Sequence, residues 1–341
     1  DRQRSKTGRC QAVIANSGNA NCCTGSKGMA DAIAMSRQAA SGLSISDELV
    51  CVASTGVIGQ ALPVEKIESA LPELIRSLSE DGFSDFAEAI MTTDTKPKIV
   101  TRKADVGGKE FTVTGIAKGA GMICPDMATM LCFVCTDIDA ESSMLQPMLQ
   151  KAVDLSFNRI TIDGDTSTND TALMLANGQA GNAPLTGDSP ATDAFRAELG
   201  GLLKDLARLI LKDAEGATKT VTIMVLRAKT AAEAKDVAYQ VANSPLVKTA
   251  FFGEDLNWGR IMAAIGKTAY DINPDSIDIL INSEKVVENS TATGLKSQAA
   301  DLLKGNEFTV TIDLHRGSAS AEVGTTDLSI EYVKINSAYP T

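Results

Sequence analysis

The sequence has very little histidine, because its 341 residues contain only His315. A nucleophile that depends on an imidazole base, as in Ser-His-Asp or Cys-His sites, would have to use this residue. His315 lies in the segment TIDLHRGSAS, at the expected end of a strand, and we expect it to be structural or solvent-exposed. If the chain is an enzyme, we therefore expect its base to be a group other than imidazole.

Long apolar runs and an excess of positive charge are also missing. No stretch approaches the roughly 20 apolar residues that span a bilayer, and the formal net charge is −11. We therefore expect neither a nucleic acid nor a membrane as a partner. The chain opens on DRQRSKTGRC, without an initiator methionine or an apolar signal region, and this favours a start that has already been trimmed.

The cysteines form no regular framework. There are 7 of them, an odd number, in a chain that is 4% aromatic, and this favours reduced thiols and a cytoplasmic location. Cys132 and Cys135 form a CxxC, but both lie in an apolar run and no second CxxC follows. We expect them to be buried small side chains, and we predict no metal site.

Helix and strand patterns alternate along a chain that is long enough for two domains. Helices are expected at 27–43, 62–78, 142–157 and 191–212, with a mostly helical segment at 230–253. Strands are expected at 49–53, at 99–119 with a turn at Gly107-Gly108, at 128–138 and at 219–228, and from about residue 276 strands mix with one short helix. The residues themselves indicate a mixed α and β fold with buried central strands and a boundary near residue 230.

Two polar loops resemble ligand-binding motifs only in part. The segment NSGNANCCTGSKG (16–28) precedes a helix but lacks the spacing of a phosphate-binding loop. The segment IDGDTSTND (162–170) has the Asp and Asn content of a calcium loop, but it lacks the glutamate at the twelfth position. We expect this second segment to be a tight polar loop near a site.

Two threonines are placed where a hydroxyl could take part in acyl chemistry. Thr55 and Gly56 follow a short apolar strand. A Thr-Gly dipeptide at the end of a strand can direct a hydroxyl and a backbone N–H at a developing oxyanion. The same step is also compatible with an ordinary turn. Thr129 directly precedes the apolar run 130–135. It is either a strand-edge threonine or a nucleophile at the mouth of a core.

Several long motifs, in a consistent order, resemble the ornithine acetyltransferase family, also called the bifunctional glutamate N-acetyltransferases of arginine biosynthesis. The resemblance runs to the last residue, and relative to the family the chain begins inside the α chain, after the usual first strands. The motifs are NSGNANCCTG, TGVIG, KGAGMICPDMATML, IDGDTSTNDT, EGATK, SPLVKTAFFGEDLNWGRI and YVKINSAYPT.

The resemblance implies a chain that cuts itself between Ala128 and Thr129. Residues 1–128 would form an α chain and residues 129–341 a β chain, of which about 230–341 would be a C-terminal subdomain. Thr129 would be the nucleophile, and its new α-amino group, with an ordinary pKa of about 7.7–8.0, would serve as its base. The implied fold is a mixed α/β layered sandwich in which helices cover stacked sheets, with a smaller C-terminal α/β domain.

The implied reaction is a ping-pong exchange. Thr129 takes the acetyl group from N-acetylornithine, ornithine leaves, and glutamate accepts the acetyl group without a cofactor or metal. Thr55 and Gly56 would hold the oxyanion. Whether acetyl-CoA also serves as a donor stays open. Family members assemble from α and β chains as α2β2, so self-association of this kind is expected.

The resemblance also implies a set of substrate contacts. Lys118 would receive a substrate carboxylate, and Glu215 would pair with the side-chain ammonium of ornithine. From the residues alone, Lys118 could equally be a solvated lysine before a glycine turn, and Glu215 a carboxylate at a helix end. The remaining predicted contacts are Thr92, Asn336 and the C-terminal Thr341.

Two other functions remain possible from the sequence. A related self-cleaving aminopeptidase or amidase would share the nucleophile but pass the acyl group to water. An uncut protein with a binding or scaffold role would not depend on Thr129.

Overall fold

The computed structural model describes residues 4–124, 130–294 and 301–338. Its centre is a four-stranded sheet with the order β3-β4-β5-β6. The strands are β3 (Lys98–Val106), β4 (Lys109–Lys118), β5 (Leu131–Thr136) and β6 (Thr171–Ala176). β3 and β4 form a hairpin whose turn, Gly107-Gly108, has positive φ angles of 63° and 81°. β5 pairs antiparallel with β4 and parallel with β6.

Helices cover one face of this sheet. α4 (Ser142–Asp154) and α5 (Pro190–Lys212) pack there against Val113 and Ala117 of β4 and Cys132 and Val134 of β5. Gly115 allows α5 to lie close to β4, because a Cβ at this position would be 2.7 Å from Leu206 Cδ1. β5 is buried on both faces, as its continuous apolar sequence predicts.

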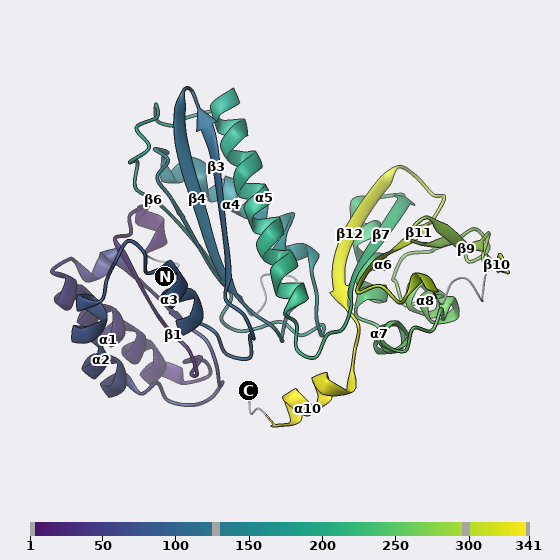
Figure 1. Ribbon diagram of the computed structural model, residues 1–341, viewed down its shortest axis with the longest axis horizontal. Helices are drawn as coiled ribbons and strands as arrows, with labels where there is room; N and C mark the ends of the chain where they lie inside the picture. The colour runs from purple at the N-terminus through teal and green to yellow at the C-terminus, as the bar shows by residue number, and fades with distance from the viewer. Residues whose placement is uncertain (1–3, 125–129, 295–300, 339–341) are drawn as a thin grey trace.

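A second, two-stranded sheet covers the opposite face. β1 (Ala12–Asn16) and β2 (Val50–Ser54) are parallel. Ala53 of β2 packs with Ile116, Leu131 and Phe133 of the central sheet and with α3 (Phe83–Ala89). α1 (Gly25–Leu43) and α2 (Val64–Arg76) cover the outer face of β1 and β2 (Figure 1). The layers are therefore helices, two stacked sheets and helices, and the predicted mixed α/β layered sandwich is confirmed.

The C-terminal part of the chain forms a six-stranded sheet with the order β10-β9-β8-β11-β7-β12. Its strands are β7 (Thr220–Ala228), β8 (Asp278–Ile281), β9 (Glu284–Glu288), β10 (Thr291–Ala292), β11 (Glu307–Asp313) and β12 (Ala319–Thr326). It packs against α6 (Ala231–Ala242), α7 (Pro245–Phe252) and α8 (Trp258–Ile265). The last helix, α10 (Ile330–Ala338), leaves β12 and extends back below the central sheet (Figure 1).

Most predicted elements are present with shifted ends. The expected helix 230–253 is divided into α6 and α7, because Ser244 and Pro245 begin a new helix. The strands β1 and β6 and the helices α3 and α8 had not been predicted as separate elements. Three short 3₁₀ helices complete the described chain: η1 (Ser5–Thr7), η2 (Asp47–Leu49) and η3 (Phe157–Arg159). In the described ranges no helix has both the length and the apolar character needed to cross a bilayer.

Cys132 and His315 lie where the sequence predicts. The Cys132 side chain is fully buried in β5, and Cys135 is partly buried. The described residues contain no group of three or more His, Cys, Asp or Glu arranged to hold a metal ion. The His315 ring is partly exposed on the C-terminal sheet, where Nε2 lies 3.1 Å from Asp278.

Candidate active site

A cavity of about 160 Å³ brings together six of the residues that the sequence predicts for the site. It lies where β2 and β4 end and where the loop 163–169 and α10 approach them. The six residues come from five separate stretches of the chain: Thr55, Gly56, Thr92, Lys118, Glu215 and Asn336. The other three predicted residues, Ala128, Thr129 and Thr341, lie outside the described residues.

Thr55 and Gly56 continue directly from β2 into the cavity wall. Thr55 is buried, with 4% of its surface exposed, and its backbone N–H donates to Asn16 O. Gly56 has φ of 130°, and a Cβ at this position would lie 2.3 Å from the backbone of Gly18. Only glycine fits this close approach in this conformation. A Thr hydroxyl and a neighbouring backbone N–H are thus held at one place on the cavity wall.

Lys118 is a buried cation at the end of β4. Its surface is 3% exposed, and its Nζ donates to the hydroxyls of Thr55 at 3.2 Å and Thr92 at 3.0 Å. Burial lowers the pKa of Lys118, and the nearby carboxylates, Asp94 above all, partly oppose this shift. The interpretation of Lys118 as a solvated lysine is therefore wrong.

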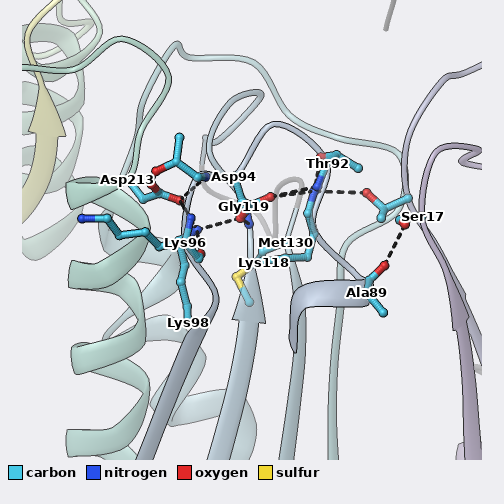
Figure 2. Close-up of polar contacts among 12 residues, drawn as sticks. Ser17, Ala89, Thr92, Asp94, Lys96, Lys98, Lys118, Gly119, Met130 and Asp213 are labelled. Carbon is cyan, nitrogen blue, oxygen red and sulfur yellow. Dashed lines mark hydrogen bonds and ion pairs between the residues drawn. The ribbon is translucent and has the colours of Figure 1, made fainter. Parts of the chain in front are cut away.

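Asp94 organises the backbone around Lys118, as Figure 2 shows. Its carboxylate accepts hydrogen bonds from the N–H groups of Gly119 at 2.6 Å and Thr92 at 3.2 Å, and Lys118 Nζ lies 3.9 Å away. Burial alone would raise the pKa of Asp94, but Lys118, Lys98 and these hydrogen bonds hold it below its usual value. Asp94 is therefore a buried anion that faces the cationic side of the cavity.

Asp94 also forms a buried ion pair with Lys98, which in turn pairs with Asp213. Lys98 Nζ lies 2.6 Å from both Asp94 Oδ1 and Asp213 Oδ2, and its side chain is 2% exposed (Figure 2). Asp213 ends α5, and its carboxylate also accepts the N–H of Thr95 at 3.0 Å. This network ties the loop 92–96 to β3 and α5, and it was not predicted from the sequence.

Glu215 and Asn336 also line the cavity. Asn336, in α10, donates through Nδ2 to Glu215 Oε2 at 2.7 Å. The Glu215 carboxylate lies against Gly121, where a Cβ would be 2.4 Å from Oε2. Glu215 follows the end of α5 by three residues. The lining of the cavity thus contains both a lysine and a glutamate, Lys118 and Glu215.

Asp163 and Tyr332 join α10 to the cavity loop. The Tyr332 hydroxyl donates to Asp163 Oδ2 at 3.2 Å, and the same carboxylate accepts the N–H groups of Met122 at 2.6 Å and Ile123 at 3.0 Å. Burial raises the pKa of both Asp163 and Tyr332. Neither residue was predicted individually, although IDGDTSTND was expected to lie near a site, and this expectation is confirmed.

Asp170 lies at the start of β6, beside the residue that follows Thr129 in the sequence. Its Oδ1 accepts the N–H of Met130 at 3.0 Å, and its buried Oδ2 has no hydrogen-bond partner among the described residues. Burial raises the pKa of Asp170 to about 7, against the effect of the Met130 N–H. The neighbouring Asn169 donates to Ser54 O at 2.9 Å and thereby links this loop to β2. Sequence reasoning missed both residues as individuals.

The chain is similar to known proteins over its whole length. The model of the ArgJ family matches residues 1–341. The Arginine biosynthesis bifunctional protein ArgJ of Geobacter sulfurreducens is 48% identical over 343 residues, which cover 100% of this chain and 87% of that protein. The protein of the same name from Syntrophotalea carbinolica is 49% identical over 340 residues, covering 99% of this chain and 86% of that protein.

A solved structure extends the likeness to the fold. The Arginine biosynthesis bifunctional protein argJ of Bacillus halodurans has a TM-score of 0.58 and 39% sequence identity to this chain. The match covers 61% of this chain and 98% of that one. The two proteins share both their fold and a substantial part of their sequence over the matched region. The similarity therefore indicates common descent and not a similar architecture alone.

Proposed function

The chain belongs to the ArgJ family, and from this premise we propose that it transfers the acetyl group of N-acetylornithine to glutamate. It is an acyltransferase, a glutamate N-acetyltransferase of arginine biosynthesis. The proposal concerns the donor, the acceptor and the residues that carry the exchange.

We propose Thr129 as the nucleophile, released by cleavage of the Ala128–Thr129 bond. The hydroxyl of Thr129 would first attack the preceding carbonyl, and water would open the resulting ester. The freed α-amine then accepts the proton of the Thr129 hydroxyl when it attacks substrate, because its ordinary pKa is close to neutral. The only histidine, His315, supports this choice, since it lies on the C-terminal sheet and does not line the cavity.

Thr55 and Gly56 are proposed to hold the oxyanion of the tetrahedral intermediate. A hydroxyl and a backbone N–H on a rigid strand end are pre-positioned donors, and such donors stabilise the charge that develops on the carbonyl oxygen. Lys118 donates to the Thr55 hydroxyl oxygen, so that the hydroxyl proton is free to point toward the oxyanion. Loss of one donor of this kind typically costs about 10²–10³ in kcat.

The charged sides of the cavity support an amino-acid substrate. We propose that Lys118, with the Thr92 hydroxyl beside it, binds the substrate α-carboxylate. Glu215 would bind the side-chain ammonium of the ornithine moiety, with Asn336 fixing the position of that carboxylate. Thr341 is proposed as a further contact from the chain end.

The proposed exchange proceeds in two steps with one site. In the first step the Thr129 oxygen bonds to the acetyl carbon, the amide C–N bond breaks, and ornithine leaves with the proton from the Thr129 hydroxyl. In the second step the amine of glutamate attacks the acetyl ester, and the hydroxyl is regenerated. Because the name of the curated relatives contains the word bifunctional, we also propose acetyl-CoA as a donor to glutamate.

We propose the division into two chains, 1–128 and 129–341, with about 230–341 as a C-terminal subdomain. The α and β chains would assemble as α2β2. Support for a join between the two chains comes from the antiparallel pairing of β4 with β5, which lie on either side of the proposed cut.

The observation that carries the proposal is the meeting of six predicted residues at one cavity with opposite charges at its sides. The test supplies the purified protein with N-acetylornithine, with and without glutamate, and measures acetylglutamate and free acetate. We expect acetylglutamate in the presence of glutamate and little acetate in either case. Acetate as the main product would instead identify an amidase and overturn the transfer reaction.

The same preparation should be examined by denaturing intact-mass analysis. Two species that together equal the chain plus one water, divided at Ala128–Thr129, are expected. In the Thr129→Ala variant we expect one uncut species and no transfer, while Thr136→Ala, a change at the far end of β5, serves as the control that is still cut. Transfer activity that survives Thr129→Ala would contradict the proposed nucleophile.

A further inference from the structure

Two adjacent thiols lie on the loop that precedes α1. Cys23 is exposed and Cys22 is partly buried, and their Sγ atoms are 3.7 Å apart. A disulfide requires about 2.05 Å between the sulfur atoms, so the two thiols are close but unbonded. Nothing in the proposed acetyl transfer uses them.

The backbone is arranged so that both thiols lie on the same side. Side chains of adjacent residues in an extended chain point in opposite directions. Here Cys23 has φ of 57°, in the left-handed region that residues other than glycine rarely adopt. Asn21, two residues earlier, also has a positive φ of 49°. The loop therefore holds two neighbouring sulfur atoms together at a conformational cost.

The spacing suits a single atom bound by both sulfurs. Two thiolates at about 2.3 Å from one centre are about 3.3–3.8 Å apart, the smaller value for a pyramidal centre and the larger for a tetrahedral one, so the observed 3.7 Å needs little change. The described part of the chain offers no cluster of three or more His, Cys, Asp or Glu, so the centre must be one that two thiolates can hold. Soft, thiophilic centres satisfy this condition, because thiolates are the ligands that they prefer.

We propose that Cys22 and Cys23 form a dithiol site for a soft thiophilic centre, of which trivalent arsenic is the representative. With phenylarsine oxide the reaction exchanges one As=O bond for two As–S bonds and releases one water, and no atom is oxidised or reduced. Cys22 raises the pKa of the Cys23 thiol, first through the hydrogen bond between the two sulfur atoms and then because two adjacent thiolates repel each other. A positive centre that binds both sulfurs removes that repulsion.

The site is connected to the wall of the active-site cavity. Cys22 O accepts the N–H of Gly59 at 2.9 Å, and the N–H of Ala20 donates to Val57 O at 3.0 Å. Ala20 itself lines the cavity. Closing a ring through Cys22 and Cys23 therefore constrains the segment that supports Gly56. This second part of the inference rests on the proposed function, and it predicts slower acetyl transfer when the dithiol is occupied.

The binding test uses phenylarsine oxide and intact-mass analysis of the native protein after removal of excess reagent. We expect one adduct per chain, which 1,2-ethanedithiol removes. Cys22→Ser and Cys23→Ser should each abolish it, because one thiol remains. Cys10→Ser is the matched control, because Cys10 has the buried Cys51 as its thiol neighbour. An adduct that persists in both single variants, or that disappears in Cys10→Ser, would overturn the assignment.

The activity test compares the parent and Cys23→Ser at saturating phenylarsine oxide. We expect acetyl transfer to fall at least 5-fold, as an order-of-magnitude expectation for displaced oxyanion donors, in the parent and to stay unchanged in Cys23→Ser. Unchanged activity in a parent that carries the adduct would overturn the connection to the cavity. If the untreated parent transfers no acetyl group, the proposed function fails, and the mass measurements still decide the dithiol site.

Discussion

Lys118 and Asp94 illustrate how burial changes the electrostatics of a charged side chain. In water an ammonium group next to a carboxylate 3.9 Å away would have nearly its ordinary pKa. In this site both groups are almost fully buried, so burial lowers the pKa of Lys118 while Asp94 opposes that shift. The charge that Lys118 is proposed to offer a substrate carboxylate thus depends on Asp94, which does not itself line the cavity.

Replacing Asp94 with Asn should move the alkaline limit of activity to lower pH. Asp94 raises the pKa of Lys118, so its loss lowers that pKa further and Lys118 loses its proton at a lower pH. We expect KM for N-acetylornithine to rise above that pH while kcat changes less. The measurement is the pH profile of kcat/KM for the parent and Asp94→Asn.

Asp213→Asn is the control that separates charge from stability. Asp213 also binds the buried Lys98, so each substitution breaks a buried ion pair, which typically costs about 3–5 kcal/mol. Asp213 is not among the groups that shift the pKa of Lys118. Both variants should therefore unfold at lower denaturant concentration, but only Asp94→Asn should shift the profile. An equal shift in both would refute the positioning role of Asp94.

Replacing Asp170 with Asn should change how stability depends on pH. Burial raises the pKa of Asp170 to about 7, well above its ordinary value near 3.9. A raised carboxyl pKa means that the folded state binds the proton more tightly, so stability is lost as pH rises from about 4 to 7. The neutral Asn keeps an acceptor for the Met130 N–H and avoids this loss. Thermal unfolding should show that the variant gains on the parent between pH 5 and pH 8.

The opposite outcome would also be informative about Asp170. If the variant instead loses stability relative to the parent at pH 8, a cation must face the carboxylate there. Lys118, which already acts to lower the pKa of Asp170, and the freed amine of Thr129 are the candidates. That result would contradict the expected titration near pH 7.

The helix α10 is held by its polar contacts rather than by apolar packing. It has no buried residue, and Ile330 and Val333 are exposed. Its attachments near the cavity are the Tyr332 hydroxyl on Asp163 and the Asn336 amide on Glu215. α10 follows β12 of the C-terminal sheet and runs back to the candidate cavity (Figure 1). It therefore connects the C-terminal sheet to that cavity.

Tyr332→Phe should weaken substrate binding without removing the chemistry. The substitution deletes the hydrogen bond to the Asp163 carboxylate, and a bond to a charged group contributes about 1.5–3 kcal/mol. We expect KM for N-acetylornithine to rise about 10-fold or more, because Asn336 loses its fixed position beside Glu215. Steady-state kinetics of the variant give the measurement.

Lys334→Ala provides the comparison on the same helix. Lys334 forms an exposed pair with Glu331, and such pairs contribute little. Its KM should match that of the parent. A rise in KM that is equal in both variants would show that α10 is simply unstable, and the specific role of the Tyr332 contact would be lost.

The proposed cut falls between two strands that pair with each other. β4 precedes it and β5 follows it, and they are paired from Val113 opposite Thr136 to Lys118 opposite Leu131. α5, which also follows the cut, packs on β3 and β4. Lys98 and Asp213 form a buried ion pair across the same division. The hydrophobic core of the sandwich is therefore built from residues on both sides.

Cleavage should consequently leave the two chains together under native conditions. Separating them would break the pairing of β4 with β5 inside the central sheet and expose apolar core residues of both chains to water, at about 25 cal/mol for each Å² of apolar surface. We expect both fragments to elute in one peak in size-exclusion chromatography and to separate only in denaturant. The uncut Thr129→Ala variant should elute at the same volume. Fragments that separate without denaturant would contradict this account of the core.

Patterns within the sequence predicted the elements better than the contacts between them. The β3–β4 hairpin followed from Gly107-Gly108, and the buried β5 followed from an unbroken apolar run. Asp94, Asp163 and Asp170 gave no comparable signal, because an isolated aspartate in a polar loop looks alike whether it is exposed or buried. The contacts in this network join residues far apart in the chain. Asp213 binds Lys98, and the Tyr332 hydroxyl binds Asp163.

The amino-acid sequence alone was sufficient for most of the helices and strands, for the family resemblance and for the residues proposed to carry the chemistry. Periodicity, glycine turns and motif order are properties of the sequence itself, and they can be identified without knowledge of the fold. Only the folded chain decided that Lys118 is buried, that Asp94 lies beside it and that Glu215 lines the same cavity. Burial and electrostatic coupling arise between residues distant in sequence, so they exist only when the layers have packed together.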